Sequence, residues 1–368
     1  MYNGKYQPLL IPPVVKGEWV IRMKFAKCDP KTKKPSTGKK IAIIGAGPGG
    51  LTVAGELICK GHDVDVYEAL PEPGGLLVFG IPDFRMPKDE IMRGIEELKN
   101  LGVRFFCNTK VSKDIDLGEL LEKYDAVIIA TGAWREREID IPGRELKGVY
   151  TVLELLSKLA LSNRGFIDKK DVPEIGKRVV IIGGGNSALD AARTIKRMGA
   201  NVTIIYRRTK EYMPAFKSEV NAAEKEGINF IFLASPIRFI SDEEGRVKAV
   251  ECIKMKLGPP DSSGRPRPEP IPGSEFQVPC DTVILAIGEL PTPPFHDGEK
   301  YGIKTDQKGR IITDEKGRTT RRGVFAVGDV VTGPKDIASA IKMGKIVAEA
   351  VDEYLRTGEW PKTTEKSS

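Results

Sequence analysis

The chain has 368 residues, of which 40% are hydrophobic and 30% are charged, and it carries a formal net charge of +7 at pH 7. This composition predicts a folded chain of two ordinary or three small domains and excludes a disordered one. No apolar run approaches the ~20 residues that a membrane-spanning helix requires, so no membrane span is predicted. The apolar residues 9–15 contain two prolines and lack the order of a signal peptide, which favours a cytoplasmic location.

Residues 1–40 are predicted to form an N-terminal arm that ends in a basic linker. Eight Lys or Arg residues and one Asp occur in 21–40, together with one aromatic residue, Phe25. A groove for nucleic acid needs stacking aromatic side chains as well as positive charge, so nucleic-acid binding is not predicted. The basic stretch is interpreted either as a solvated linker or as a docking surface for an acidic protein such as a ferredoxin.

The five cysteines contain no C-x-x-C pair and offer neither a thioredoxin-type redox pair nor an iron–sulfur ligand set. We therefore expect free thiols, which fit a reducing cytosol, and no metal site. The cysteines are Cys28, Cys59, Cys107, Cys252 and Cys280.

The first strong motif is IAIIGAGPGGLTVA at 41–54. An apolar strand leads into G-x-G-x-x-G and then into a helix, an arrangement that lets a backbone turn approach a pyrophosphate at a helix N-terminus. The following strand ends at Glu68, 18 residues after Gly50, where an acid is expected to bind the ribose of a dinucleotide. Strand, loop, helix and acid together predict a dinucleotide site.

The same device recurs in VVIIGGGNSALDAA at 179–192, with Gly183, Gly185 and Ala188 as G-x-G-x-x-A. Here the next strand ends in Arg207 and Arg208 rather than in an acid. Guanidinium groups can bind a 2′-phosphate that a carboxylate would repel, so the second loop is predicted to bind NADP(H) rather than NAD(H). One of the two arginines is alternatively expected in an ordinary ion pair.

Three further strand ends carry a small residue and glycine. YDAVIIATGAW (124–134) and DTVILAIGELP (281–291) form a matched pair, and VFAVGDVVTGP (324–334) breaks at Gly328–Asp329 before a predicted helix at 337–355. One interpretation of Asp329 is that it serves solely as a helix N-cap and binds no ligand.

The combination of GAGPGG near the N-terminus with GVFAVGD near the C-terminus resembles the two-dinucleotide-binding-domain flavoproteins. Three segments are similar to one subfamily, which includes the glutamate synthase small (β) subunit and the large subunit of NADH-dependent ferredoxin:NADP oxidoreductase. They are EPGGLLVFGIPDFRMPK (72–88), GGGNSALDAAR (183–193) and YRRTKEYMPAFKSEVNAAEKEGI (206–228).

The resemblance implies an α/β fold with two Rossmann-like doubly wound domains, the NADP domain being inserted in the FAD domain. The expected segments are an N-terminal arm at 1–40, FAD-binding parts at 41–149 and 288–355, an NAD(P)-binding domain at 150–287, and a tail at 356–368.

The resemblance implies that FAD binds to the first loop, with Asp329 on the ribityl chain and the helix that begins at Ile337 directed at the flavin. The predicted FAD-binding residues are Gly45, Ala46, Gly47, Pro48, Gly49, Gly50, Glu68, Gly74, Gly75, Leu76, Arg85, Ala130, Thr131, Gly132, Gly328, Asp329 and Ile337. The predicted NADP-binding residues are Gly183, Gly184, Gly185, Asn186, Ser187, Ala188, Arg207, Arg208, Ala286, Ile287 and Gly288.

The implied function is an FAD-dependent NAD(P)H oxidoreductase that exchanges electrons with an iron–sulfur protein or partner subunit in a hetero-oligomer. Hydride transfer needs stacked rings rather than a protein acid or base, so no catalytic side chain is predicted. The members of that subfamily carry an N-terminal iron–sulfur domain, whereas here the N-terminal region has 40 residues with Cys28 alone. The expected iron–sulfur centre therefore belongs to another polypeptide or is absent.

Two alternatives remain open. One is a stand-alone NADPH reductase of quinones, dyes or oxygen. The other is a non-catalytic flavoprotein scaffold, against which the intact motifs at both loops argue.

Overall fold

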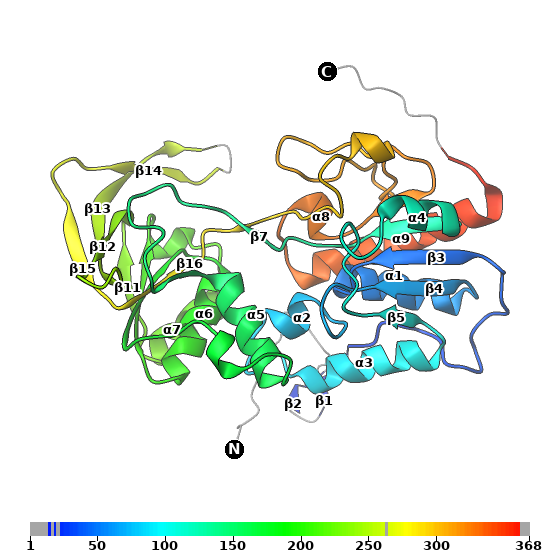
Figure 1. The fold of residues 1–368 in the computed structure, drawn as a ribbon, viewed down its shortest axis with the longest axis horizontal. Helices are drawn as coiled ribbons and strands as arrows, with labels where there is room; N and C mark the ends of the chain where they lie inside the picture. The colour runs from blue at the N-terminus through cyan, green and yellow to red at the C-terminus, as the bar shows by residue number, and fades with distance from the viewer. Residues whose placement is uncertain (1–13, 16–17, 20–22, 262–263, 361–368) are drawn as a thin grey trace. The chain divides into compact units, whose positions relative to one another are not determined.

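The computed structural model describes residues 14–15, 18–19, 23–261 and 264–360. The chain forms two compact units: unit 1 comprises Met1–Arg135 and Glu289–Ser368, and unit 2 comprises Glu136–Gly288. Unit 2 is therefore inserted in the sequence of unit 1. Each unit is built around a parallel five-stranded sheet (Figure 1), which confirms the predicted α/β class.

The elements of unit 1 are, in chain order, β1 (Val14–Val15), β2 (Glu18–Trp19), β3 (Lys40–Ile44), α1 (Pro48–Cys59), β4 (Asp63–Tyr67), α2 (Leu76–Phe79), α3 (Lys88–Asn100), β5 (Arg104–Phe106), α4 (Leu117–Lys123), β6 (Ala126–Ile129), the 3-10 helix η3 (Glu299–Tyr301), β18 (Val324–Ala326), α8 (Asp329–Thr332) and α9 (Ile337–Thr357). The sheet order is β18-β6-β3-β4-β5, and β1 pairs with β2 in an antiparallel hairpin. The central strands β3 and β6 are buried runs of Ile, Val and Ala, which is typical of parallel strands covered on both faces.

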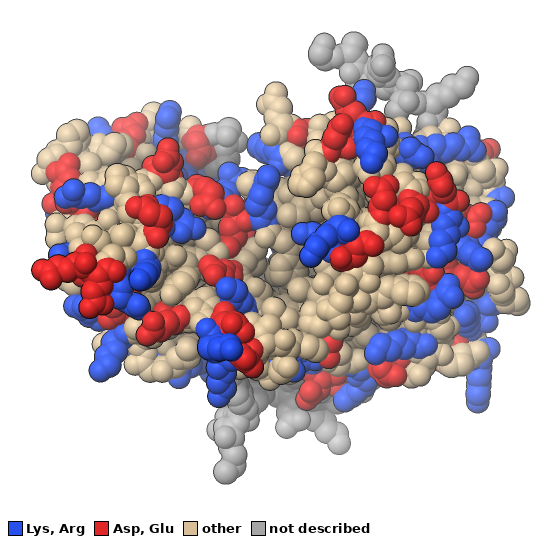
Figure 2. Space-filling view, in the orientation of Figure 1, with Lys and Arg blue, Asp and Glu red and all other residues tan. Residues whose placement is uncertain are grey.

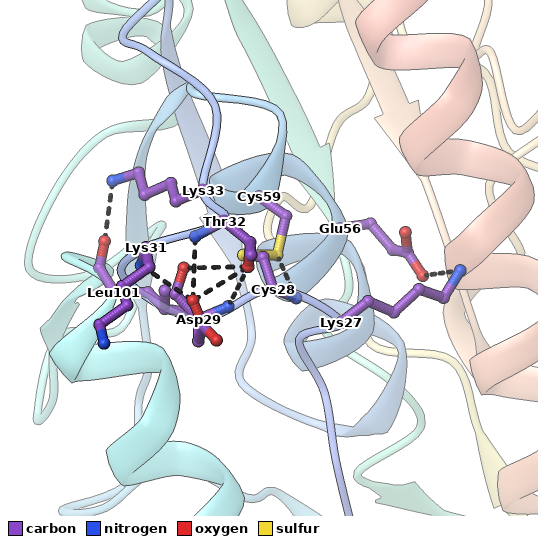
Figure 3. The surroundings of a disulfide bond; sticks show 9 residues. All are labelled: Lys27, Cys28, Asp29, Lys31, Thr32, Lys33, Glu56, Cys59 and Leu101. Carbon is purple, nitrogen blue, oxygen red and sulfur yellow. Dashed lines mark hydrogen bonds and ion pairs between the residues drawn. A yellow bond between two sulfur atoms is a disulfide. The ribbon is translucent and has the colours of Figure 1, made fainter.

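The segment 23–40, predicted as part of an arm and linker, contacts unit 1 along its length. Met23, Phe25 and Ala26 are buried, and a disulfide joins Cys28 to Cys59, the last residue of α1 (Figure 3). The expectation of free thiols is therefore wrong for two of the five cysteines. Packing of the segment on α1 brings together two cysteines that are 31 residues apart in the sequence.

Lysines of the basic stretch also bond within unit 1. Lys27 forms an ion pair with Glu56 at 3.0 Å, and Lys33 Nζ donates to the Leu101 carbonyl at 2.8 Å (Figure 3). Lys39 pairs with Asp125 at 3.2 Å. The two ion pairs neutralise part of the positive charge of the stretch.

We predict that unfolding the oxidised protein without reductant exposes three reactive thiols, those of Cys107, Cys252 and Cys280, and that reductant raises the number to five. The disulfide closes a loop with a sequence separation of 31, so C28S should lower the unfolding temperature of unit 1. Loop-closure entropy suggests a loss of about 3–4 kcal/mol, or roughly 6–16 °C for a unit of this size. Thiol titration and a thermal melt, each with and without reductant, measure both. Five thiols without reductant would contradict the disulfide.

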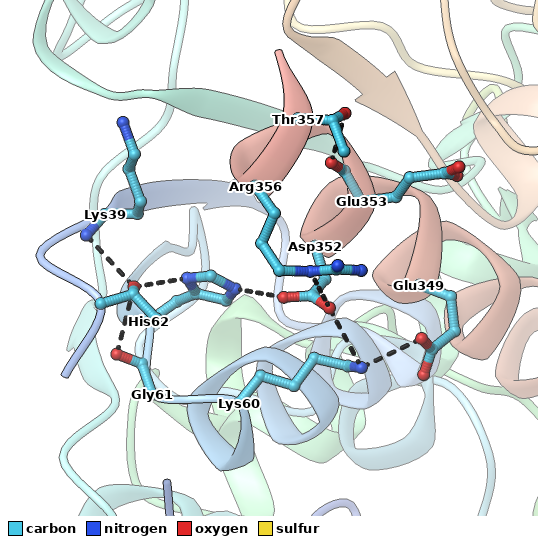
Figure 4. A network of polar contacts seen from close by, with 10 residues as sticks. Lys39, Lys60, Gly61, His62, Glu349, Asp352, Glu353, Arg356 and Thr357 are labelled. Atoms are coloured by element: carbon cyan, nitrogen blue, oxygen red, sulfur yellow. Dashed lines mark hydrogen bonds and ion pairs between the residues drawn. The ribbon is translucent and has the colours of Figure 1, made fainter. Parts of the chain in front are cut away.

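A second contact ties the same segment to the C-terminal helix α9. His62 is buried, its Nδ1 lies 2.7 Å from Thr37 Oγ1, and its Nε2 lies 2.9 Å from Asp352 Oδ1. Lys60 and Arg356 converge on the same carboxylate (Figure 4). Burial acts to raise the pKa of Asp352, but the His62 hydrogen bond and the two cations outweigh it and hold the pKa below its usual value. His62 is thus a structural residue of unit 1.

The elements of unit 2 are β8 (Val149–Thr151), α5 (Val152–Asn163), η1 (Lys169–Asp171), β9 (Arg178–Ile182), α6 (Asn186–Arg197), β10 (Asn201–Tyr206), η2 (Lys210–Tyr212), α7 (Lys217–Lys225), β11 (Asn229–Phe232), β12 (Ala234–Ser241), β13 (Val247–Pro260), β14 (Pro266–Pro270), β15 (Phe276–Pro279) and β16 (Thr282–Leu285). The parallel order is β11-β10-β9-β16-β8. Strands β12 to β15 form an antiparallel sheet that the sequence analysis did not predict. The connecting strands β7 (Arg135–Glu136) and β17 (Glu289–Leu290) pair with each other.

No helix in the described ranges is long and apolar enough to cross a bilayer. Within the same ranges, no group of three or more His, Cys, Asp or Glu side chains could hold a metal ion.

Candidate dinucleotide-binding sites

The first glycine loop, residues 45–50, connects β3 to α1 and is fixed by its backbone. The Gly45 amide donates to the Tyr67 carbonyl at 2.8 Å, and the Ala130 amide donates to the Ile44 carbonyl at 2.8 Å. Gly45 has φ +104°, and a Cβ there would overlap the Ala130 carbonyl oxygen. Glycine is therefore required where the loop crosses the end of β6.

The opposite side of this loop is open. Gly47 is the N-cap of α1 and has an extended backbone, and a Cβ at Gly47 would meet no atom within 4 Å. No side chain caps the start of α1. The N–H groups of the first turn and the helix dipole therefore favour an anion at this position, as in phosphate-binding loops.

Glu68 lies directly against the first glycine loop. Its carboxylate accepts hydrogen bonds from the amides of Ala46 and Leu70, both at 2.8 Å, and the residue is 6% exposed. Burial raises the pKa of Glu68, and the two backbone donors oppose that rise. The predicted ribose acid is thus next to the loop, 22 residues from Ala46 in sequence.

The predicted Gly74–Gly75 segment covers the same loop. The Gly74 amide donates to the Ala46 carbonyl at 2.8 Å, and a Cβ on Gly75, which has φ +53°, would lie 2.9 Å from Gly47 Cα. Leu76 begins α2 immediately afterwards, and Arg85 is buried a few residues further on.

The ends of β6 and β18 contribute the remaining predicted residues of unit 1. These strands are paired, and the Val327 amide donates to the Ile129 carbonyl at 2.9 Å. The Thr131 hydroxyl is buried and, among the described residues, has no hydrogen-bond partner. Of the other predicted residues, Ala130 and Gly132 flank Thr131 after β6, Gly328 and Asp329 follow β18, and Ile337 is the first residue of α9. An orphaned buried hydroxyl next to the open loop is a feature that a bound polar ligand would satisfy.

Asp329 is the first residue of α8, not a helix N-cap. The N-cap of α8 is Gly328, and the N-cap of α9 is Asp336, whose carboxylate accepts from the Ser339 amide at 2.8 Å. The carboxylate of Asp329 instead accepts from the Lys335 amide at 3.1 Å. Burial, opposed by this hydrogen bond, raises the pKa of Asp329 to about 6.

We predict that D329N stabilises the cofactor-free protein at neutral pH. Because the folded pKa of about 6 exceeds the ordinary 3.8, the folded state binds this proton more tightly, and stability is lost as pH rises from about 4 to 6. The ionised carboxylate then costs up to ~3 kcal/mol at pH 7, which the amide removes. Denaturant melts of both proteins at pH 4 and pH 7 measure this. A stability difference that is equal at the two pH values would contradict the prediction.

The second glycine loop, residues 183–188, repeats the first one in unit 2. The Gly183 amide donates to the Ile205 carbonyl at 3.1 Å, and the Ala286 amide donates to the Ile182 carbonyl at 2.8 Å. Gly183 has φ +143°, and a Cβ there would overlap the Ala286 carbonyl oxygen. At Gly185, the uncapped N-cap of α6, a Cβ would meet no atom within 4 Å. Each loop therefore has one glycine where a Cβ would overlap the backbone and one glycine where a Cβ would meet no protein atom.

The segment after β10 supports the second glycine loop. Asn186 Oδ1 accepts from the Phe216 amide at 3.0 Å, and the Ala215 amide donates to the Gly184 carbonyl at 3.3 Å. Ser187 and Ala188 follow in the first turn of α6, and Ile287 and Gly288 follow Ala286. The sequence analysis quoted the 206–228 motif but did not predict that it contacts the loop.

The two arginines after β10 differ in environment. Arg208 is 2% exposed, and its guanidinium donates to Asp261 at 2.6 Å and to the Pro266 carbonyl at 2.7 Å. Arg207 is exposed. Although the residue is exposed, the surrounding protein atoms still remove part of the hydration of its guanidinium, and this desolvation, followed by the nearby charge of Arg208, lowers the pKa of Arg207. Arg208 is therefore the arginine in an ion pair, and Arg207 is the one accessible to a ligand.

The chain thus carries the same strand–loop–helix arrangement on two parallel sheets. It belongs to the pyridine nucleotide-disulphide oxidoreductase family, whose profile matches residues 39–344. Over 339 residues it is 41% identical to the NADP(+)-dependent formate dehydrogenase subunit beta of Moorella thermoacetica, a match covering 91% of this chain and 46% of that protein. Over 330 residues it is 38% identical to the glutamate synthase (NADPH) small chain of Escherichia coli K12, covering 87% and 69%. These matches confirm the predicted family.

The chain spans about half the length of the first of these relatives and just over two thirds of the second. Its fold is similar to that of FprA from Mycobacterium tuberculosis, solved in complex with NADPH, with a TM-score of 0.72 and 23% identity over 88% of this chain and 87% of that one.

Proposed function

We propose that unit 1 binds FAD, that unit 2 binds NADP(H), and that the chain is the electron-transfer subunit of a larger oxidoreductase. The observation that carries this proposal is the presence of two equivalent glycine loops. Gly45 and Gly47 of the first glycine loop are matched by Gly183 and Gly185 of the second. A chain that bound one dinucleotide would need one such loop.

The features of unit 1 fit FAD. The open side of Gly47 and the uncapped start of α1 would receive the pyrophosphate, and Glu68 would accept from the adenosine ribose. Asp329 would accept from the ribityl chain, and Thr131 would gain the hydrogen bond that its hydroxyl needs. When bound, FAD supplies hydride acceptance from a nicotinamide and release of single electrons.

The features of unit 2 fit NADP(H). Gly185 and the start of α6 would receive the pyrophosphate. Of the two arginines predicted to bind the 2′-phosphate, we now propose Arg207 alone, because Arg208 is buried and bonded to Asp261. The negatively charged 2′-phosphate would accept two parallel N–H hydrogen bonds from the positively charged guanidinium of Arg207.

The relatives support a partner, because they are named as subunits or chains of multisubunit enzymes. We propose an iron–sulfur protein or subunit, in a hetero-oligomer. Among the described residues on the face shown in Figure 2, Lys and Arg side chains are interspersed with Asp and Glu, so these residues form no extended basic surface that would mark a docking site. The cytoplasmic location stays a prediction that has lost one of its arguments, because disulfides are uncommon in most cytosols.

The test is NADPH oxidation by the FAD-loaded chain with different acceptors. We expect an added [2Fe–2S] ferredoxin to be reduced faster than quinone or oxygen at equal concentration. Faster transfer to quinone or oxygen than to the iron–sulfur protein would overturn the electron-transfer role and favour a stand-alone reductase.

A further inference from the structure

Lys88 is the last residue of the GIPDFRMPK stretch (80–88), and it belongs to neither of the two glycine loops. It is the first residue of α3, and it is 9% exposed. Both features are unfavourable for a lysine, since a helix N-terminus disfavours a cation and burial removes its hydration. A residue that breaks two rules of stability in this way points to a positioning role.

The ammonium group of Lys88 bonds to the segment that contains α2. Its Nζ donates to the Leu77 carbonyl at 2.7 Å and to the Ile81 carbonyl at 2.6 Å. The ion pair with Asp83 is longer, at 3.8 Å, and the Asp83 side chain is exposed. Leu77 lies in α2, whose last carbonyls need partners from outside the helix, and Ile81 follows the C-cap Gly80. Lys88 therefore fixes the C-terminal end of this segment.

The other end of the same segment is fixed to the first glycine loop. The Gly74 amide donates to the Ala46 carbonyl at 2.8 Å, and Gly75 approaches Gly47 so closely that a Cβ would lie 2.9 Å from its Cα. Residues 74–81 are thus held by the loop at one end and by Lys88 at the other. Loss of the Lys88 contacts would free the segment to move away from the loop.

We propose that Lys88 is a positioning residue for FAD, which holds residues 74–81 against the first glycine loop. This inference rests on the proposed binding of FAD to unit 1. Lys88 acts through the carbonyls of Leu77 and Ile81 and not by contact with the cofactor.

The test compares K88M with K99M in the FAD-free protein. Methionine keeps the length and the apolar stem of Lys88 but removes its donors, and Lys99 is an exposed lysine of the same helix. The dissociation constant for FAD is measured by fluorescence quenching, well below the melting temperature of each variant, so that stability does not enter. We expect K88M to bind FAD at least tenfold more weakly, K99M to bind it within twofold of the wild type, and K88R to recover part of the loss.

A lysine that served stability alone would lower the melting temperature and leave the dissociation constant for FAD unchanged, and that result would overturn the inference. If K88M does not fold, K88Q takes its place, and we expect its dissociation constant for FAD to be at least threefold higher than that of the wild type. Absence of FAD binding by the wild type would overturn the proposed function and this inference with it. Tight binding by the wild type and equally tight binding by K88M or its replacement would overturn this inference alone.

Discussion

G47A is expected to weaken FAD binding by at least ~100-fold without lowering the unfolding temperature of the FAD-free protein. Gly47 has φ −76° and ψ −176°, which alanine adopts readily, and a Cβ there would meet no atom within 4 Å. The methyl group would therefore clash with no protein atom but would occupy space that a phosphate needs. A steric conflict of ~3 kcal/mol corresponds to about two orders of magnitude in affinity.

The matched control for this variant is G185A, which makes the same change in unit 2. It should leave FAD binding within about twofold and weaken NADP⁺ binding, whereas G47A should do the reverse. Fluorescence quenching for FAD, calorimetry for NADP⁺ and thermal melts of both variants measure the outcome. Normal FAD binding by G47A would contradict the assignment of FAD to the first glycine loop.

R207A should reduce kcat/KM for NADPH by roughly 10–100-fold and change kcat/KM for NADH by less than about threefold. A charge-assisted hydrogen bond contributes ~1.5–3 kcal/mol, and this one would be made to the 2′-phosphate that NADH lacks. Arg207 is exposed at the end of β10, in a position where NAD-binding proteins carry an acid. Steady-state kinetics with both nucleotides on the FAD-loaded protein measure the ratio.

R208A provides the contrast for R207A. It would remove a buried guanidinium that bonds to Asp261 and to the Pro266 carbonyl, so it should destabilise unit 2 by roughly 1.5–3 kcal/mol while preserving the preference for NADPH over NADH. Equal loss of activity with NADPH and NADH in R207A, or a changed preference in R208A, would contradict the division of roles between the two arginines.

The residues that could be predicted from sequence belong to local units. Gly45, Gly47 and Glu68 lie on one strand–loop–helix–strand segment, and the chemistry of that segment requires their spacing. The same holds for Gly183 and Gly185. In each loop, the glycine with positive φ and the glycine with open space are the two that the motif specifies.

The contacts that could not be predicted join residues far apart in the chain. Cys28 reaches Cys59 because the segment before β3 packs on α1, and His62 reaches Asp352 across a separation of 290 residues. Arg208 donates to Asp261, 53 residues later, which follows β13 where that strand pairs with β14. No spacing rule connects these pairs, since tertiary packing alone brings them together.

The sequence pattern of β12 and β13 indicates the antiparallel sheet of unit 2, although that sheet was not predicted. Strand β12 carries the sequence ASPIRFIS, and β13 alternates buried and exposed positions over VKAVECIKMK, as half-buried strands do. The sheet matters for the site because its hairpin supplies the partners that bury Arg208.

We propose that this one chain binds two different dinucleotides, FAD and NADP(H), and passes a hydride between them. An anaerobic titration of the FAD-reconstituted protein with NADPH, and separately with NADH, tests it most directly. We expect tight FAD binding and a visible flavin band that stoichiometric NADPH bleaches, with NADH effective only at higher concentration. A protein that binds no FAD, or whose bound FAD is indifferent to NADPH, would contradict it.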